Sequence, residues 1–131
     1  MPQLSANHKR AISSTLFLLE KMAEEIVFTF NKTDPSVMQE TVHDLDDSTK
    51  AAILQTLQQI KQEIEVMAER YQLQPQKLVE SHFVNARKSK AWEMLHNTKA
   101  KQLNAFGKFP PELEPEFDAG LEKLLKLIEK I

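Results

Sequence analysis

Three stripes of apolar residues constrain this chain more than any other feature of its sequence. Within each stripe the residues recur mainly at alternating spacings of four and three, which places their side chains on one side of an α-helix. The first, second and third seams are Ile12, Leu16, Leu19, Ala23, Ile26 and Phe30; Ile53, Leu57, Ile60, Ile64, Met67 and Tyr71; and Phe117, Leu121, Leu124, Ile128 and Ile131. None of these positions holds an Asp, Glu, His or Lys that could do chemistry inside a bundle. Each seam therefore predicts a helix that packs against a partner helix.

Capping and helix-stopping residues predict the extent of four main helices. The expected ranges run from Ala6, capped by Ser5 or Asn7, to Asn31; from a cap at Asp47 or Ser48 to Tyr71; from Gln74-Pro75 to Phe106; and from Pro115, capped by Glu114, through the third seam. Between the first two helices, Asp34 and Pro35 are typical of an N-cap and a first helical position. They predict a short extra helix with Val37, Met38 and Val42 on its apolar side.

The third predicted helix changes its apolar face part-way along. Apolar side chains of residues 78–86 project roughly 120° away from those of residues 91–106, by the helical period. The change falls at the polar residues 87–90. Because a straight helix cannot direct both stripes at one core, we predict a bend or break between Ala86 and Ala91.

These patterns predict an all-α fold, an antiparallel four-helix bundle with a short extra helix between helices 1 and 2 and a kinked or broken third helix. Residues 1–131 are expected to form a single helical-bundle domain, since a chain of this length buries enough surface for one core. The connections between the first and second and between the third and fourth helices are long enough to allow a non-adjacent pairing.

The composition excludes several classes of site. The chain contains no cysteine, which excludes disulfides, thiolate metal sites and cysteine nucleophiles. Its two glycines, Gly107 and Gly120, are too few for a phosphate-binding glycine loop. The polar N-terminus and the shortness of the apolar run 16–19 favour a soluble, cytoplasmic protein without a membrane span.

Charge is nearly balanced overall, with a net charge of −2, but it is unevenly distributed. Residues 87–108 carry six basic residues and one acid, whereas residues 34–47 and 112–122 each carry five acids and no base. We expect the basic stretch to face these acidic segments within the fold. Because Trp92 lies among the cations, a nucleic-acid-associated protein using residues 87–108 is an alternative. The acidic isoelectric point, near 6.1, disfavours nucleic acid as a partner.

Two Glu-x-x-His pairs, Glu40 with His43 and Glu93 with His96, suggest another alternative. On a helix this spacing places both side chains on one face, and two such pairs with two further glutamates form the di-metal site of some helical bundles. A small metal-binding bundle protein or enzyme would use these pairs. However, the seams supply no inward carboxylate, and Glu93 and His96 are predicted to lie opposite the apolar side of their helix. We therefore expect no bound metal.

Phe17 and Phe28 indicate a further surface on the first predicted helix. Their side chains project roughly 150° away from the first seam. Exposed phenylalanines are uncommon, and each buries a large area when it is covered. The cover would come from the apolar residues of the crossover, residues 32–46, or from a second copy of the chain. A symmetric contact between two copies of the first helix predicts a homodimer.

Together, these patterns predict a non-enzymatic interaction or regulatory protein that acts through helix–helix contacts. No catalytic residue, metal ligand or cofactor is expected, and the expected partners are a second copy of the chain and a further protein. The candidate interaction surface comprises Phe17, Phe28, Arg87, Lys88, Lys90 and Trp92.

Overall fold

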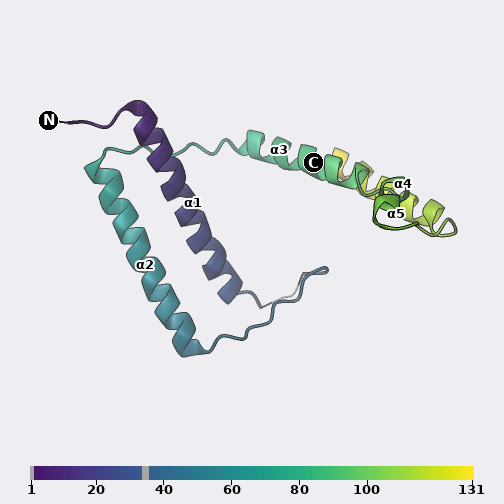
Figure 1. The fold of residues 1–131 in the computed structure, drawn as a ribbon, viewed down its shortest axis with the longest axis horizontal. Coiled ribbons are helices and arrows are strands. Elements are labelled where there is room, and N and C mark those ends of the chain that lie inside the picture. The colour runs from purple at the N-terminus through teal and green to yellow at the C-terminus, as the bar shows by residue number, and fades with distance from the viewer. Residues whose placement is uncertain (1, 34–35) are drawn as a thin grey trace. The chain divides into compact units, whose positions relative to one another are not determined.

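The computed structural model describes residues 2–33 and 36–131. Over these residues the chain is helical and contains no strand (Figure 1). The elements are α1 (Ala6–Phe30), α2 (Asp47–Arg70), α3 (Glu80–His96), α4 (Ala100–Leu103), the 3₁₀ helix η1 (Asn104–Phe106) and α5 (Glu114–Glu129). The all-α class predicted from the seams is therefore confirmed. None of the described helices is both long and apolar enough to cross a membrane.

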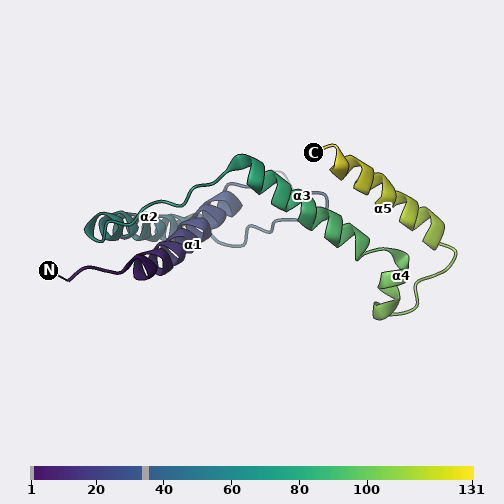
Figure 2. The ribbon, with the colours of Figure 1, turned by 90° about the horizontal axis from the view of Figure 1, so that it is seen from above.

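The chain divides into two compact units, residues 1–76 and 77–131. The first unit is a hairpin in which α1 and α2 run antiparallel, side by side (Figures 1 and 2). Leu57 and Ile64 of the second seam are its buried residues, and all six residues of the first seam are half-buried. The first two seams thus mark the sides on which α1 and α2 pack together. Tyr71, at the end of the second seam, is exposed.

Side-chain caps begin both helices of this hairpin. The Ser5 hydroxyl accepts a hydrogen bond from the His8 backbone N–H at 3.1 Å, as predicted for the start of α1. The α2 cap is Asp46, one residue before the predicted Asp47 or Ser48, and its carboxylate accepts from the Thr49 N–H at 2.7 Å. This hydrogen bond lowers the pKa of Asp46, because it stabilises the charged form of the carboxyl group.

The described part of the crossover, residues 36–46, contains no helix, so the short extra helix predicted there is not formed. Its predicted first residues, Asp34 and Pro35, lie outside the described residues. Val37 and Met38, its predicted apolar side, are 98% and 92% exposed. A helix of two turns needs tertiary packing to be stable in water, and these side chains have none.

The second unit is a hairpin of α3 and α5, which run antiparallel and side by side (Figure 2). Its buried residues are Leu121 and Leu125 of α5 and Ala100 of α4. Leu124, a member of the predicted third seam, is 48% exposed, whereas its neighbour Leu125 is 4% exposed. The prediction was wrong at this position because both leucines continue a helical stripe from Leu121, at spacings of three and four. Only the direction of the neighbouring helix decides between them.

The third predicted helix breaks later than expected. α3 is continuous through residues 86–91, and the interruption falls at Asn97–Lys99. The Thr98 hydroxyl donates to the Met94 carbonyl at 2.7 Å, and Lys99 adopts an extended conformation with φ −58° and ψ 152°. The Ala100 N–H, which begins α4, then donates to the Asp118 carboxylate of α5 at 2.9 Å. A polar contact with α5 therefore accompanies the break. The spacing of apolar residues could not have predicted this contact.

The start of this helix also differs from the prediction, since α3 begins at Glu80 rather than at Pro75. The change of apolar face is accommodated without a bend. In the first half of α3, Phe83 and Val84 stay 45% and 38% exposed, and no residue of α3 is buried. Apolar residues of the second half are exposed as well, since Trp92 and Met94 are 50% and 53% exposed. The predicted interruption between Ala86 and Ala91 is therefore wrong, because neither stripe of α3 is fully buried.

Leu124 and Leu125 form a matched pair for testing the core of the second unit. We expect Leu125→Ala to lower the free energy of unfolding by about 2–5 kcal/mol, because it leaves a cavity beside α3. Leu124→Ala should cost less than about 1 kcal/mol, as for other exposed positions. Denaturant unfolding followed by circular dichroism measures both. Equal costs would contradict the placement of Leu125 rather than Leu124 in the core.

The Asp46 cap predicts a pH dependence. Because the folded-state pKa of Asp46 is lowered, its stabilisation is complete well above the ordinary value of 3.8 and is lost as the pH falls through the folded-state pKa. Asp46→Asn keeps a capping oxygen that does not titrate. We expect the wild type to be more stable than Asp46→Asn at pH 7 and the difference to vanish near pH 2, as measured by thermal unfolding. A difference that is independent of pH would contradict the assigned cap.

Candidate interaction surface

An open groove with a mainly apolar lining runs along the α1–α2 hairpin. Its volume is about 630 Å³, and its apolar lining is Ala23, Val27 and Phe28 of α1 with Leu54, Leu57, Ile60 and Ile64 of α2. Part of this lining is solvent-exposed, since Val27, Leu54 and Phe28 are 38%, 39% and 69% exposed. The packing of α1 on α2 therefore covers one side of each seam and leaves an apolar strip beside it. The three seams did not reveal this groove. A signal was present in the sequence, since Val27 is one helical turn after Ala23 of the first seam and Leu54 is one turn before Gln58, and all four residues line the groove.

The two helices that line the groove carry opposite charges there. Glu20 and Glu24 line it from α1, and Gln58 and Lys61 line it from α2. All four side chains are exposed. Because Glu20 and Glu24 are four residues apart, they lie on the same face of α1. The groove thus has a mainly apolar lining with two carboxylates on α1 and one cation on α2.

The structure places Phe28 in this groove and Phe17 outside it. Phe17 is 38% exposed, and the Lys21 ammonium lies 5.9 Å from the centre of its ring. Phe28 also borders a second hollow, of about 620 Å³, between α1 and the crossover. Because Phe28 is still 69% exposed there, the crossover does not cover it.

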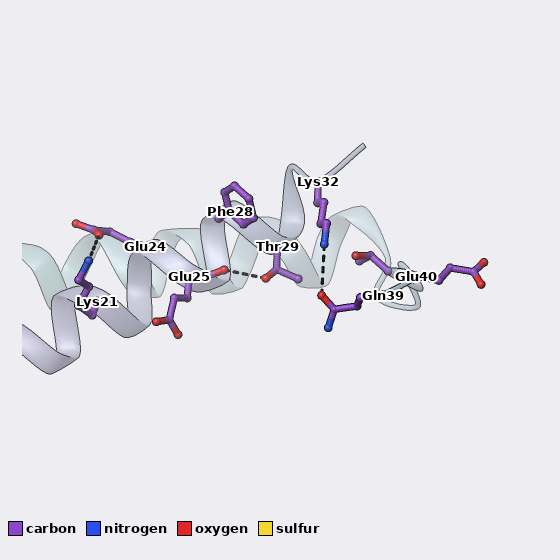
Figure 3. Close-up of a pocket in the computed structure, with 9 residues that line it drawn as sticks. Lys21, Glu24, Glu25, Phe28, Thr29, Lys32, Gln39 and Glu40 are labelled. Atoms are coloured by element: carbon purple, nitrogen blue, oxygen red, sulfur yellow. Dashed lines mark hydrogen bonds and ion pairs between the residues drawn. The ribbon is translucent and has the colours of Figure 1, made fainter. Parts of the chain in front are cut away.

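Figure 3 shows that charged and amide side chains surround this second hollow. Lys21 pairs with Glu24 at 4.0 Å, and the Lys32 ammonium donates to the Gln39 side-chain oxygen at 3.4 Å (Figure 3). These side chains are exposed, so their interactions contribute little to stability. No charged or polar residue is buried anywhere in the described part of the chain. The side chains that line this hollow are therefore accessible to solvent.

The two Glu-x-x-His pairs are not brought together with further ligands. Within residues 2–33 and 36–131, no group of three or more His, Asp or Glu side chains is arranged to hold a metal ion. His43 contacts the Lys32 carbonyl through Nε2 at 2.8 Å and the Lys50 ammonium through Nδ1 at 3.2 Å. His96 packs against Trp92, with 3.9 Å between ring centres. Both histidines thus have structural partners.

His43 connects the crossover to both helices of the hairpin. With the proton on Nε2, the ring donates to the Lys32 carbonyl after α1, and Nδ1 accepts from Lys50 in the first turn of α2. The His43 ring therefore joins the two ends that the crossover spans.

Several cations of the basic stretch are engaged within the second unit. The Lys88 ammonium donates to the carbonyl oxygens of Glu129, the last residue of α5, and of Ile131, at 3.2 and 3.1 Å. The Arg87 guanidinium lies 4.9 Å from the centre of the Phe83 ring. Of the remaining candidates, Lys90 is exposed and Trp92 is 50% exposed. The structure does not bring the basic candidates and the two phenylalanines into one unit, since Phe17 and Phe28 belong to the first.

The expected pairing of the basic stretch with an acidic segment occurs at Lys99. Its ammonium donates to the Glu122 carboxylate of α5 at 2.6 Å. This hydrogen bond and the charge of Lys99 lower the pKa of Glu122. Together with the Ala100–Asp118 contact, it ties the α3–α4 turn to α5.

Comparison with known proteins finds no match: no family, no curated protein and no solved structure is similar to this chain at the level of significance required.

The role of His43 can be tested by proteolysis. His43→Leu removes both hydrogen bonds of the ring, so we expect a protease specific for glutamate to cleave the crossover after Glu40 several-fold faster than in the wild type. His8→Leu, an equally conservative change on exposed α1, is the control and should leave the rate unchanged. Equal cleavage rates in all three proteins would show that His43 does not hold the crossover.

Proposed function

We propose that this protein is a non-enzymatic interaction protein that acts through helix–helix contacts, and that its helices complete an antiparallel four-helix bundle. The observation that supports this proposal is the apolar groove of the α1–α2 hairpin, where Val27, Phe28 and Leu54 are exposed beside the packed seams. A second layer of two helices laid on this groove would form four helices around one core. A small-molecule site would instead require convergent polar groups in an enclosed pocket.

Energetics favour such a second layer. In the first unit only Leu57 and Ile64 are buried among the described residues. Two helices expose most of their apolar surface to water, and covering a side chain the size of phenylalanine or leucine contributes about 1.5–3 kcal/mol. An additional pair of helices therefore stabilises the hairpin considerably.

The working assembly that we propose is a homodimer. A two-fold dimer uses the same surface on both chains and leaves no open interface, so the exposed Phe28 of each chain would be covered by one contact. A stable dimer buries at least about 1,000 Å² in total. The exposed phenylalanines and the groove beside them supply apolar area for such a contact.

The contacts of the basic stretch favour this role over nucleic-acid binding. Lys88 is bound to the end of α5, and Lys99 is paired with Glu122. Cations that neutralise phosphates must be available to the nucleic acid, and their release of counterions makes binding strongly salt-dependent. Weak binding of mixed DNA and RNA fragments, if any, is thus the expectation for residues 87–108.

Sedimentation at micromolar concentration tests the homodimer. The wild type should sediment at twice the mass of the 15.1 kDa chain. The double variant Phe17→Glu with Phe28→Glu should give a folded monomer or a markedly weaker dimer, because it places carboxylates in an apolar contact.

Phe106→Glu is the matched control, since Phe106 is 89% exposed in the second unit and should not affect association. Circular dichroism shows whether each variant keeps its helices. A wild type that remains a monomer at these concentrations would contradict the proposed homodimer.

A further inference from the structure

We propose that the groove between α1 and α2 is occupied by the same groove of a second copy, with α1 of each chain opposite α2 of the other. This inference rests on the proposed homodimer and names the surface and the pairing that form it. The two-fold axis then runs parallel to the helices, and every neighbouring pair of helices in the resulting four-helix core is antiparallel.

The shape and lining of the groove fit a pair of helices. Its lining spans residues 20–28 of α1 and residues 54–64 of α2, so each wall is about 12–15 Å long at 1.5 Å per residue. Seven of its eleven lining residues are apolar, and the other four are Glu20, Glu24, Gln58 and Lys61. Such a surface accepts the apolar stripe of another helix and satisfies no buried polar group of a small ligand.

The charges that line the groove decide which helix of the second copy lies opposite α1. Glu20 and Glu24 line it from α1, and Lys61 lines it from α2. Because α1 and α2 are antiparallel along the groove, Lys61, near the end of the 54–64 stretch, lies toward the end that carries Glu20, and Glu24 is one helical turn further along. With α1 opposite α2 of the second copy, Glu20 therefore faces Lys61 of the partner subunit at about the same height, with Glu24 one turn away.

The other symmetric pairing is disfavoured by charge. If α1 lay opposite α1 of the second copy, as the position of Phe17 and Phe28 alone suggests, Glu20 and Glu24 would face their own counterparts. Like charges brought together at an interface oppose association. In a two-fold dimer the complementary pairing occurs twice. An unrelated partner would match it only if it carried a cation opposite α1 and an acid opposite α2.

Charge reversal with mixing tests this pairing. One chain carries Glu20→Lys with Glu24→Lys, and the other carries Lys61→Glu. Each variant alone should dimerise roughly tenfold or more weakly than the wild type, because like charges then meet at both contacts. In a one-to-one mixture, the two introduced lysines of one chain meet the introduced glutamate of the other, and the second contact is native. The mixture should therefore recover the wild-type dimer in sedimentation equilibrium.

Glu63→Lys is the control, since Glu63 is exposed on α2 and does not line the groove. It should leave the association constant unchanged, and circular dichroism should be the same for all variants. A dimer of Lys61→Glu as tight as the wild type, or a mixture that recovers nothing, would overturn the pairing while leaving the homodimer in place. A monomeric wild type, as expected if the second unit or another protein fills the groove, would overturn both.

Chemical cross-linking provides a measurement that does not depend on charge repulsion. Because the chain contains no cysteine, single-site variants can be labelled without a background. A mixture of Glu24→Cys and Lys61→Cys chains should be joined by a short bismaleimide, and Glu24→Cys chains alone should not. Efficient cross-linking of Glu24→Cys chains to one another would instead support the α1-to-α1 pairing and overturn the proposed one.

Discussion

The packing of Leu57 and Ile64 on the half-buried seam of α1 is the interaction on which the first unit depends. The helix caps at Ser5 and Asp46 set where α1 and α2 begin, but a cap orders only the first turn. Isolated helices gain most of their stability from tertiary contacts along an apolar face. Once this seam is closed, the crossover must span the gap between the two helix ends, and His43 contacts both.

The second unit combines a small apolar core with polar contacts to α5. Leu121 and Leu125 are buried, and the α3–α4 turn is held by the Ala100–Asp118 hydrogen bond and the Lys99–Glu122 pair. These polar contacts have a functional consequence. They place Lys99 against an acid of its own chain, which makes it less available to an outside anion. The charge imbalance of residues 87–108 is thus partly compensated within the unit.

The apolar surface beside the first seam connects the fold with the proposed function. A helix in a two-helix hairpin has one face against its neighbour and still presents apolar side chains on the flank, as Val27 and Leu54 do. Assembly of two such flanks removes this surface from water without a change in either hairpin. The acidic and basic residues that line the groove then influence orientation more than affinity, because exposed charge pairs contribute little energy but penalise a wrong pairing.

The sequence by itself determined the helical class, the ends of α1 and α2 to within about a residue, and the sides on which these two helices meet, since capping chemistry and apolar periodicity act locally. It also placed Phe17 and Phe28 away from the first seam and predicted a cover for them, whereas the structure leaves both exposed. Tertiary structure decided what periodicity leaves open. Leu125 rather than Leu124 is buried because the direction of α3 selects between two neighbouring leucines. The break after α3 is accompanied by a contact with Asp118, a residue distant in sequence. In the crossover, Val37 is exposed and lacks the tertiary packing that a short helix needs.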